Sequence, residues 1–244
     1  MISGLYSAAA GMSAQQQQLD AIGNDLANAS TTGYKAERVA FGDLLYNEVD
    51  QTGSKSSIGA GAKSVMIGRN QAQGAIQDTG NPLDLAIQGE GFFQLKRPDG
   101  KTVLTRNGAF SVDSQGRLTS DNGSLLDPPV TLPRGTSPSE VEISLDGTVR
   151  SGTRTLGKIP LMTVAAPDRL VAEGNGEFTT NAASGAPHAA AASNTIRQAA
   201  LEGSNVDLAS EMTTMMTTQR SYQMASSAIK TQDQMMSIAN QLRS

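Results

Sequence analysis

The chain of 244 residues carries a net charge of −4 and contains neither cysteine nor tryptophan. Its length allows one large domain or two small ones, and the acidic balance argues against nucleic acid or an anionic membrane surface as a partner. The missing cysteines exclude disulfides and thiolate metal sites, and because no run of about 18 apolar residues occurs, we expect no membrane-spanning helix.

Residues 1–33 are predicted to form an N-terminal helix that serves assembly. Apolar side chains recur there every seven residues, which places them on one stripe of the helix: Leu5, Met12, Leu19 and Leu26. The run of serine, threonine and glycine at residues 30–33 is expected to end the helix. The same region lacks the basic segment and apolar core of a cleaved secretory signal, so we expect any export to use another route.

Residues 34–80 are predicted to form an extended connector, which from Asp50 to Gly80 is rich in glycine, serine and glutamine. A short strand is expected at residues 64–67. Residues 34–49 are weakly amphipathic, and they fit either a short helix or an extended arm. The connector is therefore the part of the chain with the weakest local signal.

Residues 81–200 are predicted to form a central β domain, because apolar side chains alternate with a period of two between turn signals. Four turn dipeptides mark the expected hairpin reversals: Asp99-Gly100, Gln115-Gly116, Asn122-Gly123 and Asp146-Gly147. Residues 182–194 are low in complexity and are expected to form a mobile surface segment. An all-β domain between terminal helices makes the predicted fold class α+β.

The central domain contains no motif that predicts catalysis. Its carboxylates, among them Glu90 and Asp113, are scattered, and nothing in their spacing marks a pair for acid–base work. The single histidine, His188, lies among alanine, proline and serine, whereas a catalytic base needs neighbours that position it. We therefore predict that the protein is not an enzyme and has no catalytic, cofactor or metal site.

Residues 201–244 are predicted to form a second assembly helix, capped by Ser204 with Asp207 three residues later. One heptad stripe contains Leu208, Met215, Tyr222, Ile229 and Met236. A second apolar group lies on the opposite side: Met216, Met224, Ala228, Met235, Ile238 and Leu242. A buried core helix or a simple coiled-coil strand is the alternative interpretation. The few charges between the stripes favour a helix that contacts several neighbours, one of them the N-terminal helix in a coiled coil.

Three segments of the sequence resemble the bacterial flagellar basal-body rod and hook protein family. The first follows the pattern Asn-x-Leu-Ala-Asn, then Thr, Gly, an aromatic and a basic residue, and reads GNDLANASTTGYKAERVAFGDLL from Gly23. The second, in the β domain, reads LDLAIQGEGFFQL and then TRNGAFSVDSQGRL. The third reads LEGSNVDLASEMTTMMTTQRSYQMASSAIKTQDQM from Leu201. The three segments occur in the family's order and span nearly the whole chain.

The resemblance implies a structural subunit of the basal-body rod, which spans the periplasm and is exported by the flagellar type III apparatus without a cleaved signal. Family members polymerise into a helical tube that transmits motor torque to the hook and filament. The implied partners are further copies of the chain, other rod and hook subunits, bushing ring proteins and the export apparatus, with no nucleic acid and no membrane insertion. The β-domain segments most resemble distal rod proteins, and proximal rod proteins are the nearest alternative.

The expected assembly interface combines the two heptad stripes with the two asparagines of the N-terminal pattern, Asn24 and Asn28. Since a single pair of polar, alanine- and methionine-rich helices buries little apolar surface, both helices are expected to be largely disordered in the monomer. Two interpretations from other classes remain: a binding module that uses the β domain, and a periplasmic peptidoglycan hydrolase. Neither a binding module nor a hydrolase explains a C-terminal helix with two apolar faces.

Overall fold

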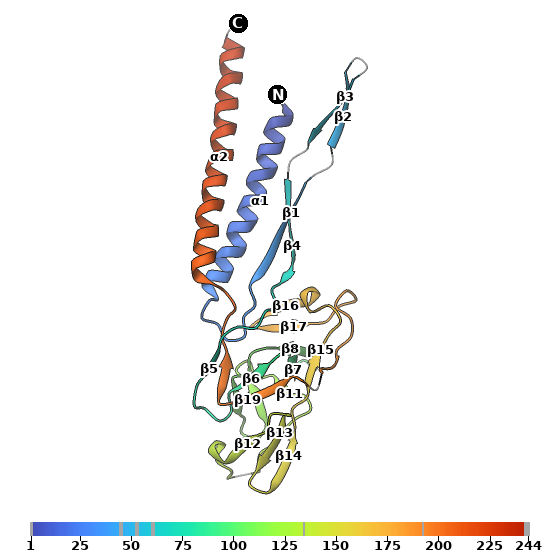
Figure 1. Cartoon of the computed structure of the whole chain (residues 1–244), viewed down its shortest axis with the longest axis vertical. Helices are drawn as coiled ribbons and strands as arrows, with labels where there is room; N and C mark the ends of the chain where they lie inside the picture. Colours follow the sequence, from blue (N-terminus) through green and yellow to red (C-terminus); the bar gives the residue numbers. More distant parts are fainter. Residues whose placement is uncertain are drawn as a thin grey trace. The chain divides into compact units, whose positions relative to one another are not determined.

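The computed structural model describes residues 2–43, 46–51, 54–59, 62–133, 135–191 and 193–241. Its fold is α+β, with an N-terminal helix, a mostly β central region and a C-terminal helix (Figure 1). The chain forms two compact units. Unit 1 comprises the described parts of residues 1–27, 37–67 and 207–244, and unit 2 comprises residues 28–36 and 68–206.

Two long helices dominate unit 1. Helix α1 (Ile2–Ala27) and helix α2 (Leu208–Gln241) lie side by side and run antiparallel (Figure 1). Helix α2 begins after Asp207, whose Oδ1 accepts the backbone N–H of Ala209 at 3.0 Å. The N-terminal cap is therefore Asp207 and not Ser204, whose hydroxyl accepts the N–H of Val206 instead. Neither helix that the structure describes holds an apolar stretch long enough to cross a membrane.

Unit 1 also contains most of the segment expected to be a connector. Strand β1 (Glu37–Asp43) pairs with β4 (Ala62–Arg69), and β2 (Tyr46–Gln51) pairs antiparallel with β3 (Ser54–Gly59). The strand predicted at residues 64–67 is confirmed as part of β4. Of the two alternatives for residues 34–49, the extended arm is correct for the described residues, which include β1 and the first part of β2.

Unit 2 is built from short strands and two single turns of 3₁₀ helix, Pro138–Glu140 and Pro167–Arg169. Its largest sheet has the order β16-β17-β8-β7-β11-β10-β9, and β15 pairs with both β7 and β18. A three-stranded sheet has the order β12-β13-β14, and β6 and β5 pair with β19 and β20, respectively. The bounds are β5 (Ile76–Asp78), β6 (Leu85–Gln88), β7 (Phe92–Lys96), β8 (Thr102–Thr105), β9 (Phe110–Val112), β10 (Leu118–Ser120), β11 (Leu125–Leu126), β12 (Val141–Ile143), β13 (Thr148–Ser151), β14 (Arg154–Lys158), β15 (Leu161–Thr163), β16 (Val171–Gly174), β17 (Glu177–Thr179), β18 (His188–Ala189), β19 (Thr195–Gln198) and β20 (Ala200–Glu202).

All four predicted hairpin turns are confirmed. They join β7 to β8, β9 to β10, β10 to β11 and β12 to β13, and each pair is antiparallel. At the last turn, Gly147 has a φ of 83°, and a Cβ there would lie 2.3 Å from the carbonyl oxygen of Ile159. Only glycine meets both requirements without strain, which is why the Asp-Gly signal predicted this turn correctly.

Strand β7 separates two apolar cores of unit 2. Phe93 and Leu95 point into the larger core, where the Phe93 ring meets Phe110 edge-on at 5.3 Å. Phe92 points to the other face and meets Phe178 edge-on at 6.0 Å. Because adjacent strand residues face opposite sides of a sheet, two consecutive buried phenylalanines indicate a strand covered on both faces.

The low-complexity stretch at residues 182–194 contains a short strand that its composition did not predict. Strand β18 pairs with β15 through Met162–Ala189 and Thr163–His188. Backbone groups make this pairing, so residues with small side chains can take part in it without any signal of alternating hydrophobicity. The side chain of His188 is exposed, as expected.

Candidate assembly surface

The predicted heptad residues lie mainly on the partly buried side of each helix. Met12, Leu19 and Leu26 of α1 are partly buried, whereas the side chain of Leu5 lies outside the described part of the chain. In α2 the partly buried members of the predicted stripe are Met215, Tyr222, Ile229 and Met236. Leu208, at the first turn of α2, is instead 51% exposed.

The most buried side chains of the two helices are smaller than the heptad residues. Ala14, Ala21 and Ile22 of α1 and Thr218 of α2 are buried. Small side chains let neighbouring backbones approach closely, so they occupy the most enclosed positions while the longer heptad residues are left partly open. The prediction of interface residues was restricted to the larger apolar side chains and left out Ala14 and Ala21.

The opposite face of α2 presents a row of large apolar side chains, which we call the methionine stripe. Its members are between 51% and 66% exposed: Met212, Met216, Met224, Met235 and Ile238. At 100° per residue, Met224, Met235 and Ile238 lie about 140–200° around the helix from Met215, whereas Met216 and Met212 lie about 100° and 60° from it, at the edge of this face. Ala228, expected on this face, is exposed, and Leu242 lies outside the described residues. Exposed large apolar side chains on one side of a helix favour an interaction surface, and methionine suits it because its side chain adapts to different partners.

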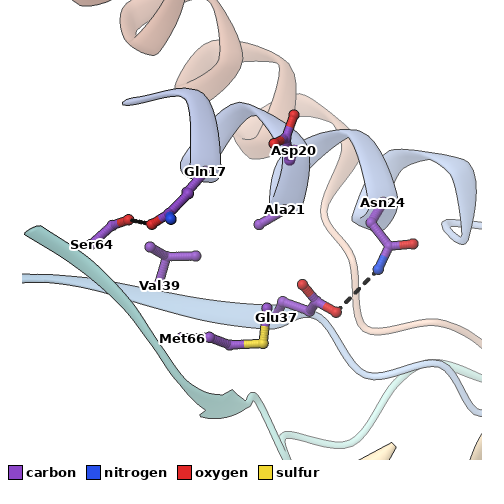
Figure 2. A pocket seen from close by; sticks show the side chains of 8 residues that line it. All are labelled: Gln17, Asp20, Ala21, Asn24, Glu37, Val39, Ser64 and Met66. Atoms are coloured by element: carbon purple, nitrogen blue, oxygen red, sulfur yellow. Dashed lines mark hydrogen bonds between the residues drawn. The ribbon is translucent and has the colours of Figure 1, made fainter. Parts of the chain in front are cut away.

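A groove of about 490 Å³ runs between α1 and the strands β1 and β4 (Figure 2). At one end, Ser64 donates its hydroxyl hydrogen to Oε1 of Gln17. At the other end, Nδ2 of Asn24 donates to Oε1 of Glu37 at 3.1 Å. The groove is lined by Gln17, Asp20, Ala21, Asn24, Glu37, Val39, Ser64 and Met66.

The two asparagines of the predicted interface have local contacts in the structure. Asn24 holds β1 to α1 through its bond to Glu37, while the neighbouring Asp25 is buried and accepts the backbone N–H of Glu37 at 3.0 Å. Oδ1 of Asn28 accepts the hydroxyl of Thr31 at 3.2 Å, and its carbonyl accepts the Thr31 N–H at 3.0 Å. Asn28 therefore stabilises the turn that follows α1.

Acidic side chains meet where the first turn of α2 faces α1. Burial raises the pKa of Glu211, and the nearby charges of Asp25 and Asp207 raise it further. The ionised form of Glu211 is thus less favourable in the folded unit than in the unfolded chain. Its contribution to stability is full below the unfolded pKa of about 4.3 and is lost as the pH rises through the higher folded value.

We therefore expect Glu211 to make the helix pair more stable near pH 4 than near pH 7. The substitution Glu211→Gln should remove this part of the pH dependence and stabilise the helices at neutral pH. Thermal melts of the helical circular dichroism of the polymerised protein at both pH values would measure it. Equal stabilisation by Glu211→Gln at both pH values would show that desolvation of this carboxylate is not the cause.

Unit 2 contains a buried group of charges, which we call the ion cluster: Lys35, Arg106 and Glu202. Nζ of Lys35 lies 2.6 Å from Oε1 of Glu202, and a guanidinium nitrogen of Arg106 lies 2.9 Å from Oε2. The three side chains are 0%, 3% and 0% exposed, respectively. Burial lowers the pKa of Lys35, although the hydrogen bond and charge of Glu202 oppose that shift. Two cations thus share one buried carboxylate.

The remaining polar atoms of the ion cluster bind the backbone of segments far apart in sequence. Lys35 also donates to the carbonyl of Ala72 at 2.8 Å, and Arg106 donates to the carbonyl of Gly89 at 2.9 Å. Glu202 accepts the N–H of Gly74 at 3.0 Å. The cluster therefore holds the segments around residues 35, 72, 89 and 202 in one place.

Asn205 extends the same network. Its Oδ1 accepts the N–H of Ala36 at 2.8 Å, and its Nδ2 donates to the carbonyls of Asn70 and Ala72 at 2.8 and 2.9 Å. Reasoning from sequence did not assign a role to this network. The signal available in the sequence was the family resemblance, whose N-terminal pattern ends on Lys35 and whose C-terminal segment contains Glu202 and Asn205.

Comparison with known proteins assigns these features to a family. The sequence models of three families match the chain: "Flagella basal body rod protein" at residues 5–35, "Flagellar hook protein FlgE/F/G D1 domain" at residues 86–151, and "Flagellar basal body rod FlgEFG protein C-terminal" at residues 197–242. The ion cluster takes one residue from each of the three matched segments: Lys35, Arg106 and Glu202.

The chain is also similar over its full length to curated rod proteins. It is 38% identical to the flagellar basal-body rod protein FlgG of Caulobacter vibrioides, with 98% of this chain and 99% of the relative covered. It is 35% identical to FlgG of Borreliella burgdorferi, with 100% and 99% covered. Identity to the rod protein FlgF of Mesorhizobium japonicum is 34%, with 91% and 90% covered.

The chain belongs to the family of flagellar basal-body rod proteins. It is a structural subunit of the basal-body rod, and its likeness to FlgG proteins favours the distal rod over the proximal rod, the place of FlgF. The resemblance predicted from the three sequence segments is thereby confirmed. The relatives are structural rod proteins and not enzymes.

Proposed function

We propose that the chain polymerises with further copies of itself into the helical tube of the distal rod, which transmits motor torque to the hook and filament. One observation carries this proposal: α2 has two apolar faces. Met215, Tyr222 and Ile229 are partly buried on one face, whereas Met224 and Met235 are exposed on the other. A helical tube needs different patches for different neighbours, which a helix with two apolar faces supplies.

In the assembled rod, α1 and α2 would pack as a coiled coil, with the methionine stripe covered by a neighbouring copy. The eleven residues of the interface would then be Leu5, Met12, Leu19, Leu26, Asn24, Asn28, Leu208, Met215, Tyr222, Ile229 and Met236, to which we add the methionine stripe. Asn24 and Asn28 would act through the local shape that their hydrogen bonds give to the end of α1.

The proposed partners are those that a subunit of the basal-body rod would contact. They are further copies of the chain, other rod and hook subunits, the bushing ring proteins and the export apparatus, which would pass the chain without a cleaved signal. We propose no enzymatic activity, no cofactor, no nucleic acid and no membrane insertion. We propose a functional division of the chain into four parts: residues 1–33, 34–80, 81–200 and 201–244. The first and last parts would serve assembly.

Basal bodies from a strain that lacks this protein test the proposal. Electron microscopy should show rods that end before their distal segment, and the gene supplied in trans should restore the full length. Complete rods would overturn the proposal, and loss of the proximal segment would move the subunit to the proximal rod. A strain that lacks only the filament protein is the matched control, because its rods should remain complete.

Before assembly, we expect both terminal helices to be largely disordered. The buried side chains of the helices are few and small, so their pairing supplies little stability compared with the cost of ordering them. Limited proteolysis of the monomer should remove α2 and cut residues 37–67, and it should leave a resistant core that resembles unit 2. Polymerised protein should resist the same treatment. Terminal helices that resist cleavage in the monomer would contradict this expectation.

A further inference from the structure

Three segments of unit 2 adjoin the places where the chain passes into unit 1. The chain passes between the two units after residues 27, 36, 67 and 206. On the unit 2 side, the last three of these places are flanked by what we call the junction segments: residues 33–36, 69–75 and 202–205. Load that the covalent chain carries into unit 2 at these places therefore reaches the junction segments first.

The first and third junction segments, which lie near the two ends of unit 2 along the chain, are bonded to each other. The N–H of Gly33 donates to the carbonyl of Glu202 at 2.8 Å, and the N–H of Asn205 donates to the carbonyl of Tyr34 at 3.3 Å. The side chain of Asn205 adds a further bond, because its Oδ1 accepts the N–H of Ala36 at 2.8 Å. Hydrogen bonds thus join the two ends of unit 2 directly.

The second junction segment is bonded to both of the others. The N–H of Asn70 donates to the carbonyl of Ala36 at 2.8 Å. Nδ2 of Asn205 donates to the carbonyls of Asn70 and Ala72 at 2.8 and 2.9 Å. An asparagine amide offers an acceptor oxygen and two donor hydrogens on one short side chain, and Asn205 uses each of them.

The second and third junction segments also touch backbone to backbone. The N–H of Gly203 donates to the carbonyl of Ala75 at 2.8 Å. A Cβ at Gly74 would lie 2.1 Å from the carbonyl oxygen of Gly203, so this close approach requires glycine. Asn205 is half-buried, which strengthens its hydrogen bonds relative to bonds in water. The junction segments therefore form a closely packed set.

We propose that Asn205 is a clasp that holds the three junction segments together under load, and that in the rod it lets unit 2 carry torque without opening from its ends. The second statement rests on the proposed function. A hydrogen bond adds only modestly to equilibrium stability, because water replaces it in the unfolded chain. Under force, however, the bonds of Asn205 must break before the ends of unit 2 can separate, so the clasp acts on the rate of forced unfolding.

The clasp is tested by pulling single molecules of the full chain with handles at its two ends. Force applied there enters unit 2 through the first and third junction segments. Asn205→Ala removes three side-chain hydrogen bonds, and it should raise the unfolding rate of unit 2 at a given force at least about tenfold. A smaller increase would overturn the proposal.

The direction of pulling separates a clasp from a residue that merely stabilises the fold. The chain has no cysteine, so Lys101→Cys and Thr153→Cys provide unique handles at two exposed positions of unit 2. Force between these handles enters unit 2 outside the junction segments, and the acceleration caused by Asn205→Ala should then be at least about threefold smaller than from the chain ends. Equal acceleration in both directions would overturn the proposal.

Asn181→Ala is the matched control, because it also removes three side-chain hydrogen bonds. Oδ1 of Asn181 accepts the N–H groups of Ala183 and Ser184 at 2.8 and 2.7 Å, and its Nδ2 donates to the carbonyl of Arg169 at 3.1 Å. These bonds lie outside the junction segments, so the effect of Asn181→Ala should not depend on the direction of pulling. The same dependence in both variants would contradict a special role of Asn205.

Asn205→Asp is measured in the same way if Asn205→Ala does not fold. Its carboxylate keeps an acceptor for the N–H of Ala36 and loses both donors to the carbonyls of Asn70 and Ala72. Its unfolding should also be accelerated more from the chain ends than from the two cysteine handles. Acceleration that is independent of direction would again overturn the clasp.

Motility under load tests the second statement. Cells that carry Asn205→Ala should build complete rods, and they should stop swimming at a lower viscosity of the medium than wild-type or Asn181→Ala cells. The same viscosity limit, or the loss of rods, would overturn the role in torque. Pulling does not depend on assembly, so complete rods in a strain without the protein would overturn the proposed function and leave the clasp in place.

Discussion

Replacing Glu202 by glutamine is expected to lower the free energy of unfolding of unit 2 by about 3–5 kcal/mol. The amide would leave Lys35 and Arg106 buried without a counter-charge, and it would force an N–H group toward donors that now bond to carboxylate oxygens. Total stabilities of about 5–15 kcal/mol are usual for a domain, so the loss would bring unit 2 close to unfolding.

The matched control for this change is Asp78→Asn. Asp78 also pairs with an arginine, Arg197, at 2.7 Å, but the two side chains are 70% and 44% exposed. An exposed ion pair contributes about 1 kcal/mol or less, so the same carboxylate-to-amide change should have a small effect there. Urea unfolding followed by β-sheet circular dichroism measures both variants. Similar losses for the two would show that burial does not set the strength of the ion cluster.

Introducing a charge on the methionine stripe should strongly weaken polymerisation while the monomer keeps its stability. Met224 is 66% exposed, so Met224→Asp disturbs little in the free chain. If a neighbour covers the stripe, the aspartate is buried without a partner, which costs several kcal/mol, and each ~1.4 kcal/mol weakens association tenfold. We expect the concentration needed for polymerisation to rise about 100-fold or more.

Ile229→Asp distinguishes the two faces of α2. Ile229 is partly buried on the face that carries the predicted heptad stripe, so this change should also block polymerisation, as should Tyr222→Asp. Unlike Met224→Asp, both should in addition weaken the pairing of the helices, while unit 2 stays folded.

The control for these charge variants is Ser237→Asp. It adds the same charge at an exposed position beside the stripe, and it is expected to polymerise. Sedimentation gives the polymer, and circular dichroism the folded fraction. Normal polymerisation of Met224→Asp would remove the stripe from the interface.

The elements with a strong local signal were predictable from the sequence. The seven-residue spacing of Met215, Tyr222 and Ile229 predicts both the helix and its partly buried face, because the helix period alone sets which residues align. The four turn dipeptides predicted their hairpins because glycine with positive φ is a local requirement. The cap at Asp207 was missed by three residues, since Ser204 and Asp207 both fit a capping pattern.

The features without a local signal could not be predicted. Strands β2 and β3 lie in a polar, glycine-rich stretch, and their existence depends on pairing with each other and not on an apolar face. The ion cluster joins residues 35, 106 and 202, and no periodicity relates positions so far apart. A buried lysine also contradicts the usual exposure of charged residues, so burial of Lys35 follows only from its partner.

The bond between Lys35 and Glu202 spans 167 positions along the chain. Contacts of such long range close large loops and form slowly, and this one joins the first segment of unit 2 to its last. A growing chain on the ribosome therefore carries Lys35 and Arg106 without their counter-charge until residue 202 has been added. Completion of unit 2 must wait until residue 202 has been synthesised, so the order of synthesis itself keeps the unfinished subunit open.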